Sequence, residues 1–180
     1  MIDRELLEEK LLELPLYVYF YIDPKTLEFS QRIRYICQAE CPRYGQSWAC
    51  PPGVGSVEQC SARCLSYNNC LAVGTITECD DIADITATLA TRHEHEAITN
   101  QVRQLMREMG TDPYILSTDS CAICTECTYP EGKPCRHKDV MHPCIESHGI
   151  NLIPTLEENG LEFQYGGNII TWYSMLFYNP

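Results

Sequence analysis

LYVYFYI, the stretch at residues 16–22, indicates the fold class because its side chains alternate between two faces. The tyrosines at odd positions face one way, whereas Val18, Phe20 and Ile22 face the other, as the two-residue period of a β-strand requires. Before this strand, residues 2–14 place leucines on one side of a helix that Pro15 ends. The chain therefore begins with an amphipathic helix followed by a strand.

The rest of the chain continues this alternation of helices and strands. Further strands are expected at 32–36, 70–76, 114–116 and 169–178, and further helices at 57–67, 85–109 and 143–148. Residues 37–52 are expected to form a loop, and the stretch from Gly149 to Gly160 to be irregular. The pattern predicts one α/β domain over residues 1–180, with a mixed β-sheet, flanking helices and two cysteine-rich metal-binding loops.

The order strand, cysteine loop, helix occurs twice, at 16–67 and at 113–148. Each loop is therefore expected to leave the end of a strand in one sheet. If those two strands are neighbours, the two loops meet.

Charge and hydropathy exclude several classes of function. The formal charge is −12, so the surface repels the phosphates of nucleic acid and the headgroups of anionic lipid. No apolar run reaches the roughly 18 residues of a membrane span, and the N-terminus is acidic, unlike a signal peptide. We expect a cytoplasmic protein without nucleic-acid or membrane partners.

Twelve cysteines are the most unusual feature of the composition. In the cytoplasm thiols are kept reduced, and a chain of 180 residues can bury a core without disulfide bonds. The cysteines therefore favour metal binding over a disulfide framework.

The second cysteine cluster carries the stronger signal. Cys121, Cys124 and Cys127 have the CxxCxxC spacing, and Cys135 follows. In bacterial ferredoxins such a loop holds three irons of a cubane while a more distant cysteine supplies the fourth ligand. Zinc favours two separated CxxC pairs. The spacing favours an iron–sulfur cluster and leaves zinc as the alternative.

The first cluster contains Cys37, Cys41 and Cys50, the last followed by two prolines. Together the clusters hold seven cysteines, one fewer than two four-cysteine sites need. Three arrangements stay open. One site has an open position, or another cysteine completes it. In the third, cross-ligation, Cys50 completes the site of Cys121, Cys124 and Cys127, and Cys135 binds at the first loop. An open iron would bind substrate as a Lewis acid.

The cysteines and histidines outside the two clusters are interpreted separately. Cys60, Cys64 and Cys70 fit core positions, although the i, i+4 spacing of the first two would also suit a metal. An alternative zinc site would combine Cys144 and His148 with nearby histidines. His93 and His95, in the helix expected at 85–109, are predicted to be solvated.

The strings CPRYGQSWACPP at 41–52, CAICTEC at 121–127, GKPCRH at 132–137 and ESHGI at 146–150 are similar to those of a known family. Together with the aromatic C-terminal strand, they resemble the uncharacterised family of predicted metal-binding proteins, over nearly the whole chain. The resemblance implies a cysteine-bound metal, with an iron–sulfur cluster as the expected form, in proteins typical of anaerobic bacteria and archaea. Seven cysteines fall on the family pattern and five are extra, namely Cys60, Cys64, Cys70, Cys79 and Cys144.

Three functions follow as expectations. The first is an iron–sulfur protein, with one or two [4Fe-4S] clusters, that transfers electrons or serves as a redox accessory in anaerobic metabolism. Its acidic surface suits a redox partner with a basic docking surface, and Arg34, Arg43 and Arg136 lie beside the expected ligands. The second is a non-redox iron–sulfur enzyme with an open iron. The third is a structural zinc-binding or metal-trafficking protein.

Overall fold

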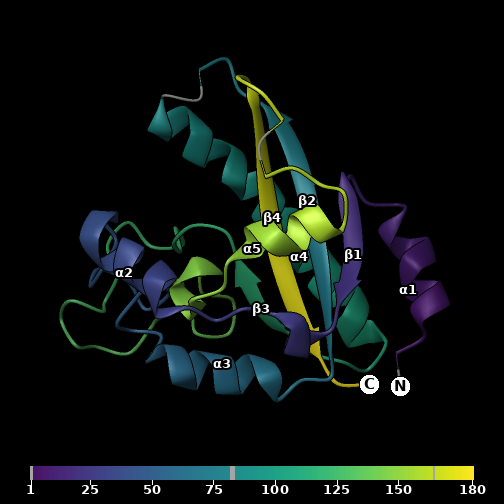
Figure 1. Ribbon diagram of the computed structural model, residues 1–180, viewed down its shortest axis with the longest axis horizontal. Helices are drawn as coiled ribbons and strands as arrows, with labels where there is room; N and C mark the ends of the chain where they lie inside the picture. Colours follow the sequence, from purple (N-terminus) through teal and green to yellow (C-terminus); the bar gives the residue numbers. More distant parts are fainter. Residues whose placement is uncertain (1, 82–83, 164) are drawn as a thin grey trace.

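A four-stranded sheet forms the centre of the protein, as seen in a computed structural model that describes residues 2–81, 84–163 and 165–180 (Figure 1). The strand order is β1-β2-β4-β3, and all three neighbouring pairs are antiparallel. The strands are β1 (Val18–Ile22), β2 (Asn69–Glu78), β3 (Tyr114–Ser117) and β4 (Ile169–Tyr178). The α/β class is confirmed, whereas the expected mixed sheet is antiparallel, because helix-bearing connections can also join antiparallel strands.

Helices cover both faces of the sheet. On one face lie α1 (Arg4–Leu11) and α4 (Ile85–Glu108), packed against Leu71 and Val73 of β2. The opposite face carries α3 (Val57–Leu65), α5 (Leu152–Glu158) and the short 3-10 helix η2 (Glu146–His148), packed around Cys70 and Ala72. Successive residues of β2 thus pack into the hydrophobic cores on opposite faces of the sheet, as the pleat of a strand requires. A further 3-10 helix, η1 (Pro24–Thr26), follows β1.

The prediction of a strand at 32–36 was wrong, because this segment lies inside helix α2 (Gln31–Glu40). The Ser30 side chain accepts a hydrogen bond from the Arg32 amide and caps the helix. Ile33, Ile36 and Cys37 follow the i, i+3, i+4 spacing of a helical face. Cys37 therefore lies in a helix, and the first loop begins only at Cys41.

The stretch expected to be irregular after Gly149 contains α5 instead. Asn151 caps this helix by accepting a hydrogen bond from the Ile153 amide. Gly149 ends η2 in the left-handed conformation, with a φ of 78°. Glycine adopts that conformation without steric cost.

The two cysteine-bearing segments do meet, but not through neighbouring strands. β1 and β3 occupy opposite edges of the sheet, separated by β2 and β4. Figure 1 shows α2 lying on the side of the sheet away from α1, together with the loops that follow β3. Among the described residues, no helix has both the length and the apolar character needed to cross a membrane.

Candidate metal centre

Four cysteines of the second cluster line one small cavity. This set, the 121–135 group, comprises Cys121, Cys124, Cys127 and Cys135. The cavity measures about 20 Å³, so the four side chains lie close around a common space. Ser47 and Trp48 of the first loop also line it. The structure thus gathers all four predicted residues of this cluster, with Cys135 among them.

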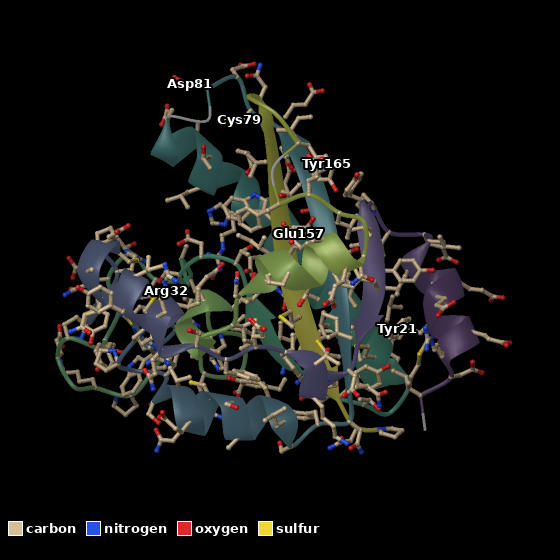
Figure 2. All side chains as sticks on the ribbon, viewed as in Figure 1. Tyr21, Arg32, Cys79, Asp81, Glu157 and Tyr165 are labelled. Atoms are coloured by element: carbon tan, nitrogen blue, oxygen red, sulfur yellow. The ribbon has the colours of Figure 1, made fainter. Side chains whose placement is uncertain are left out.

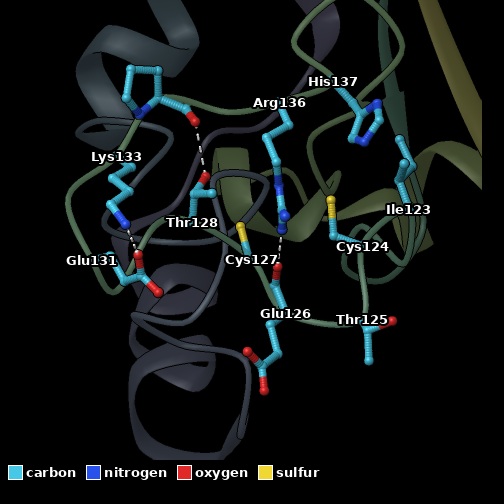
Figure 3. A pocket seen from close by; sticks show the side chains of 11 residues that line it. Ile123, Cys124, Thr125, Glu126, Cys127, Thr128, Glu131, Lys133, Arg136 and His137 are labelled. Carbon is cyan, nitrogen blue, oxygen red and sulfur yellow. Dashed lines mark hydrogen bonds and ion pairs between the residues drawn. The ribbon is translucent and has the colours of Figure 1, made fainter.

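A second, open hollow of about 890 Å³ lies beside this cavity, and its wall includes Cys124 and Cys127 (Figure 3). Arg136 also lines the hollow and donates a hydrogen bond to the Glu126 carbonyl. Lys133 pairs with Glu131 at 2.6 Å on the same wall. The 121–135 group is therefore close to the surface, among charges of both signs.

Cys127 lies where its thiolate is stabilised. Burial raises its pKa, but the backbone N–H groups of Tyr129 and Trp48 and the Ser47 hydroxyl favour the charged form, and the pKa is lowered overall. Trp48 and Ser47 belong to the first loop, so residues of both loops stabilise the Cys127 thiolate. A thiolate is the form that binds metal.

Two of the three cysteines of the first cluster line a different cavity. Cys37 and Cys41 line an apolar cavity of about 520 Å³, which Cys144 also lines. Cys50 is buried, and its thiol donates a hydrogen bond to the Ser120 hydroxyl at 3.1 Å. Burial raises the pKa of Cys50 to about 11. Cys41 is close enough to interact electrostatically with both Cys37 and Cys50.

Hydrogen bonds and a ring contact join the two loops. Arg43 donates to the Cys121 carbonyl at 3.0 Å. Trp48 donates from Nε1 to the Lys133 carbonyl at 3.0 Å, and its ring meets Tyr129 edge-on with centroids 4.9 Å apart. These contacts fix the relative position of the two cysteine groups.

Sequence reasoning missed a buried arginine that holds the start of the second loop. Arg92 of α4 is 5% exposed and donates to the Thr118 carbonyl at 2.8 Å and to the Ser120 carbonyl. It also pairs with Glu96 at 2.9 Å. Only its spacing of four residues from Glu96 is visible in the sequence, and that spacing is equally typical of an exposed ion pair.

The histidines do not gather into the alternative zinc site. His148 is buried and lies 2.7 Å from the Tyr114 hydroxyl, while His142 contacts the Asn100 side chain at 3.2 Å. The expectation of a solvated His95 was wrong. His95 is 1% exposed and lies between Thr75 and Ser174, because α4 turns this face toward the sheet.

The arginines expected beside the ligands have backbone partners. Arg43 and Arg136 contact the 121–135 segment as described above. Arg34 donates to the Gly55 carbonyl at 2.8 Å and lies 3.6 Å from the Cys60 sulfur, while its Nε has no partner. Cys60 and Cys64 are buried on α3, and Cys70 lies in the core, as the sequence predicted.

The donor chemistry of the 121–135 group, four thiols around one cavity, fits a metal cofactor. Among the residues that the structure describes, no three His, Cys, Asp or Glu side chains are placed to hold a single metal ion.

The fold and these groups define a cysteine-rich α/β protein whose thiols gather in two neighbouring places. Residues 21–178 match the family described as Predicted metal-binding protein (DUF2284), and the chain belongs to that family. No match was found among curated proteins, and none among solved structures. The resemblance stated from the sequence is confirmed, and it extends to metal binding without naming the metal.

Proposed function

We propose that the protein binds a [4Fe-4S] cluster through the 121–135 group and transfers electrons, as a redox accessory in anaerobic metabolism. The observation that carries the proposal is the shared cavity of its four cysteines, arranged with CxxCxxC spacing plus one more distant cysteine. When bound, such a cluster supplies a one-electron redox couple. The chain holds the sulfurs, supplies N–H donors to Cys127 and limits access of water.

The position of the group suits exchange with another protein. Cys124 and Cys127 line the open hollow, so the site lies near the surface where a partner can approach. The net charge of −12 attracts a partner with a basic docking surface, and that attraction weakens as ionic strength rises. Electron transfer to such a partner should therefore slow at high salt.

Iron and acid-labile sulfide analysis of protein prepared without oxygen tests the proposal. We expect equal amounts of iron and sulfide and a broad absorption band near ~400 nm that bleaches on reduction, as iron–sulfur thiolate sites show. Cys127→Ser should remove the signal of the 121–135 group. Zinc without sulfide would overturn the proposal in favour of a structural zinc protein.

Cys79→Ser provides the matched control. Cys79 is buried and donates from its thiol to the Asp81 carbonyl, a bond that a serine hydroxyl can also make. It lies near the end of β2, far from Arg32 of α2 (Figure 2). Iron, sulfide and absorbance of this variant should match the wild type.

The apolar cavity beside the first cluster favours a second candidate function. With about 520 Å³, it has the size of a small-molecule site, and thiols from Cys37 and Cys41 line it. An iron left open there would bind a substrate oxygen or sulfur and make the protein a non-redox enzyme. The two candidates differ in the place and role of the iron: electron transfer at the 121–135 group, or substrate binding at an open iron beside Cys37 and Cys41.

A further inference from the structure

Cys144 stands apart from the other cysteines that lie outside the family pattern. Cys64 and Cys70 pack inside the apolar core, whereas the Cys144 thiol donates a hydrogen bond to a carboxylate oxygen of Glu146 at 2.7 Å. Cys144 also lines the same cavity as Cys37 and Cys41. Its surroundings are therefore those of the first cluster and not of the core.

The backbone fixes Cys144 next to Cys50. The Cys144 amide donates to the Ala49 carbonyl at 3.2 Å, and Ala49 directly precedes Cys50. On the other side, the Ile145 amide donates to the Ser117 carbonyl at 2.9 Å, which anchors the segment to β3. The two thiols are close enough for electrostatic interaction.

We infer that Cys144 is the fourth ligand of a second iron–sulfur cluster, held with Cys37, Cys41 and Cys50. This inference rests on the proposed function, because it assigns iron and sulfide to the first cluster as well. It completes two four-cysteine sites with eight cysteines. Cross-ligation is then unnecessary, since Cys135 lies with the 121–135 group and Cys50 lies with Cys144.

Glu146 serves as a neighbour of this site and not as its ligand. Its carboxylate accepts the hydrogen bond of the Cys144 thiol at 2.7 Å. Arg34 also acts electrostatically on Cys37. These two charged groups flank the thiols from different elements, η2 and α2.

The two sites adjoin through one short link. The Cys50 thiol contacts the Ser120 hydroxyl, and Ser120 directly precedes Cys121 of the 121–135 group. Two reduced clusters at neighbouring sites interact magnetically. We therefore expect the electron paramagnetic resonance spectrum of the fully reduced wild type to be broadened.

Iron and sulfide content of anaerobically prepared variants tests the inference. The wild type should hold about eight irons per chain, four for each cluster. Cys144→Ala should fall to about half and lose the magnetic broadening, while Cys127→Ser should lose the other half. Cys60→Ser is the control, because its buried thiol makes a bond to the Val54 carbonyl that serine can keep.

The outcomes separate this inference from the proposed function. Wild-type protein with about four irons, all lost in Cys127→Ser, would leave the proposed function intact and overturn the second cluster. Cys144→Ala with full iron content would also overturn the inference, and if Glu146→Gln then lost half the iron, the carboxylate would be the ligand. Protein without iron or sulfide would overturn both. Retained iron at the 121–135 group shows that a variant has folded.

Discussion

The guanidinium of Arg92 donates a hydrogen bond to the carbonyl of Ser120, the residue directly before Cys121. A second bond reaches the Thr118 carbonyl, so one buried side chain of α4 holds the backbone between β3 and the second cysteine loop. Glu96 balances the charge. The long helix thus positions the loop although it supplies no thiol.

Replacing Arg92 with lysine should destabilise the protein and weaken cluster binding. Lysine keeps the charge but cannot make the forked contacts to Thr118, Ser120 and Glu96. Losing hydrogen bonds to a buried charged group costs about 2–4 kcal/mol of unfolding free energy. Urea unfolding and iron content after anaerobic preparation measure the two effects.

Arg107→Lys is the control for that experiment. Arg107 sits on the same helix and also makes a forked contact, with Asp112, but its side chain is 44% exposed. Solvent screens such pairs, so this variant should change the unfolding midpoint much less. Equal losses in the two variants would contradict a positioning role for Arg92.

Gly149→Ala should displace the helix that carries Cys37. A Cβ at this position would lie 3.0 Å from the Ser30 carbonyl and 3.1 Å from a Val57 methyl, in a left-handed backbone with φ of 78°. Strain of this kind costs about 1–3 kcal/mol. Because Ser30 caps α2 and its amide bonds to the Gly149 carbonyl at 2.7 Å, iron at the first cluster should also decrease.

Gly160→Ala is the control, because it adds the strain of a left-handed backbone without a steric contact of the new Cβ. Gly160 has a similar φ of 70°, but a Cβ there would meet nothing within 4 Å. It should lower stability by less than Gly149→Ala and leave the iron content unchanged. An equal loss of iron would show that the approach of Gly149 to Ser30 is unimportant for the site.

The gathering of the 121–135 group around one cavity could be predicted from sequence because its four cysteines are close along the chain. Four cysteines within fifteen residues share one loop, and spacing alone brings them together. Strand β1, whose side chains alternate with a two-residue period, was predicted for the same reason. Both depend only on neighbours along the chain.

The contacts of Cys144 and Arg92 could not be predicted this way, because they join segments that are distant in the sequence. The Cys144 amide donates to the carbonyl of Ala49, the residue before Cys50, and Arg92 reaches the second loop across the fold. At 32–36 the local signal itself was ambiguous, since alternation of Arg and Ile over five residues also fits a helical face. The N-cap hydrogen bond of Ser30 stabilises the helical conformation of this segment.

Trp48→Phe should make the cluster more sensitive to oxygen. Phenylalanine keeps most of the edge contact with Tyr129 but loses the hydrogen bond from Nε1 to the Lys133 carbonyl. Since this bond ties the first loop over the 121–135 group, its loss should shorten the half-life of the ~400 nm absorption in air several-fold. Tyr44→Phe, in the same loop, is the comparison, and an unchanged half-life in Trp48→Phe would contradict a covering role.

His95 should make the protein less stable in mild acid. Burial lowers its pKa to about 4, because the charged imidazole loses its hydration beside Arg92. An unfolded chain restores a pKa near 6.5, so below that pH the unfolded state binds more protons and stability falls as pH decreases. His95 alone should cost roughly 2 kcal/mol between pH 7.5 and pH 5.

Urea unfolding of His95→Gln at several pH values measures this contribution. Glutamine cannot take up a proton, so the variant should lose about 2 kcal/mol less than the wild type over the same interval. Buried His148, whose pKa is lowered to about 3 by burial, accounts for part of the acid sensitivity that remains. His93→Gln, at an exposed position of the same helix, should follow the wild-type profile. Identical pH profiles for His95→Gln and the wild type would mean that His95 takes up its proton while the protein stays folded, and the hydrogen bonds to Thr75 and Ser174 would then have to hold an imidazolium.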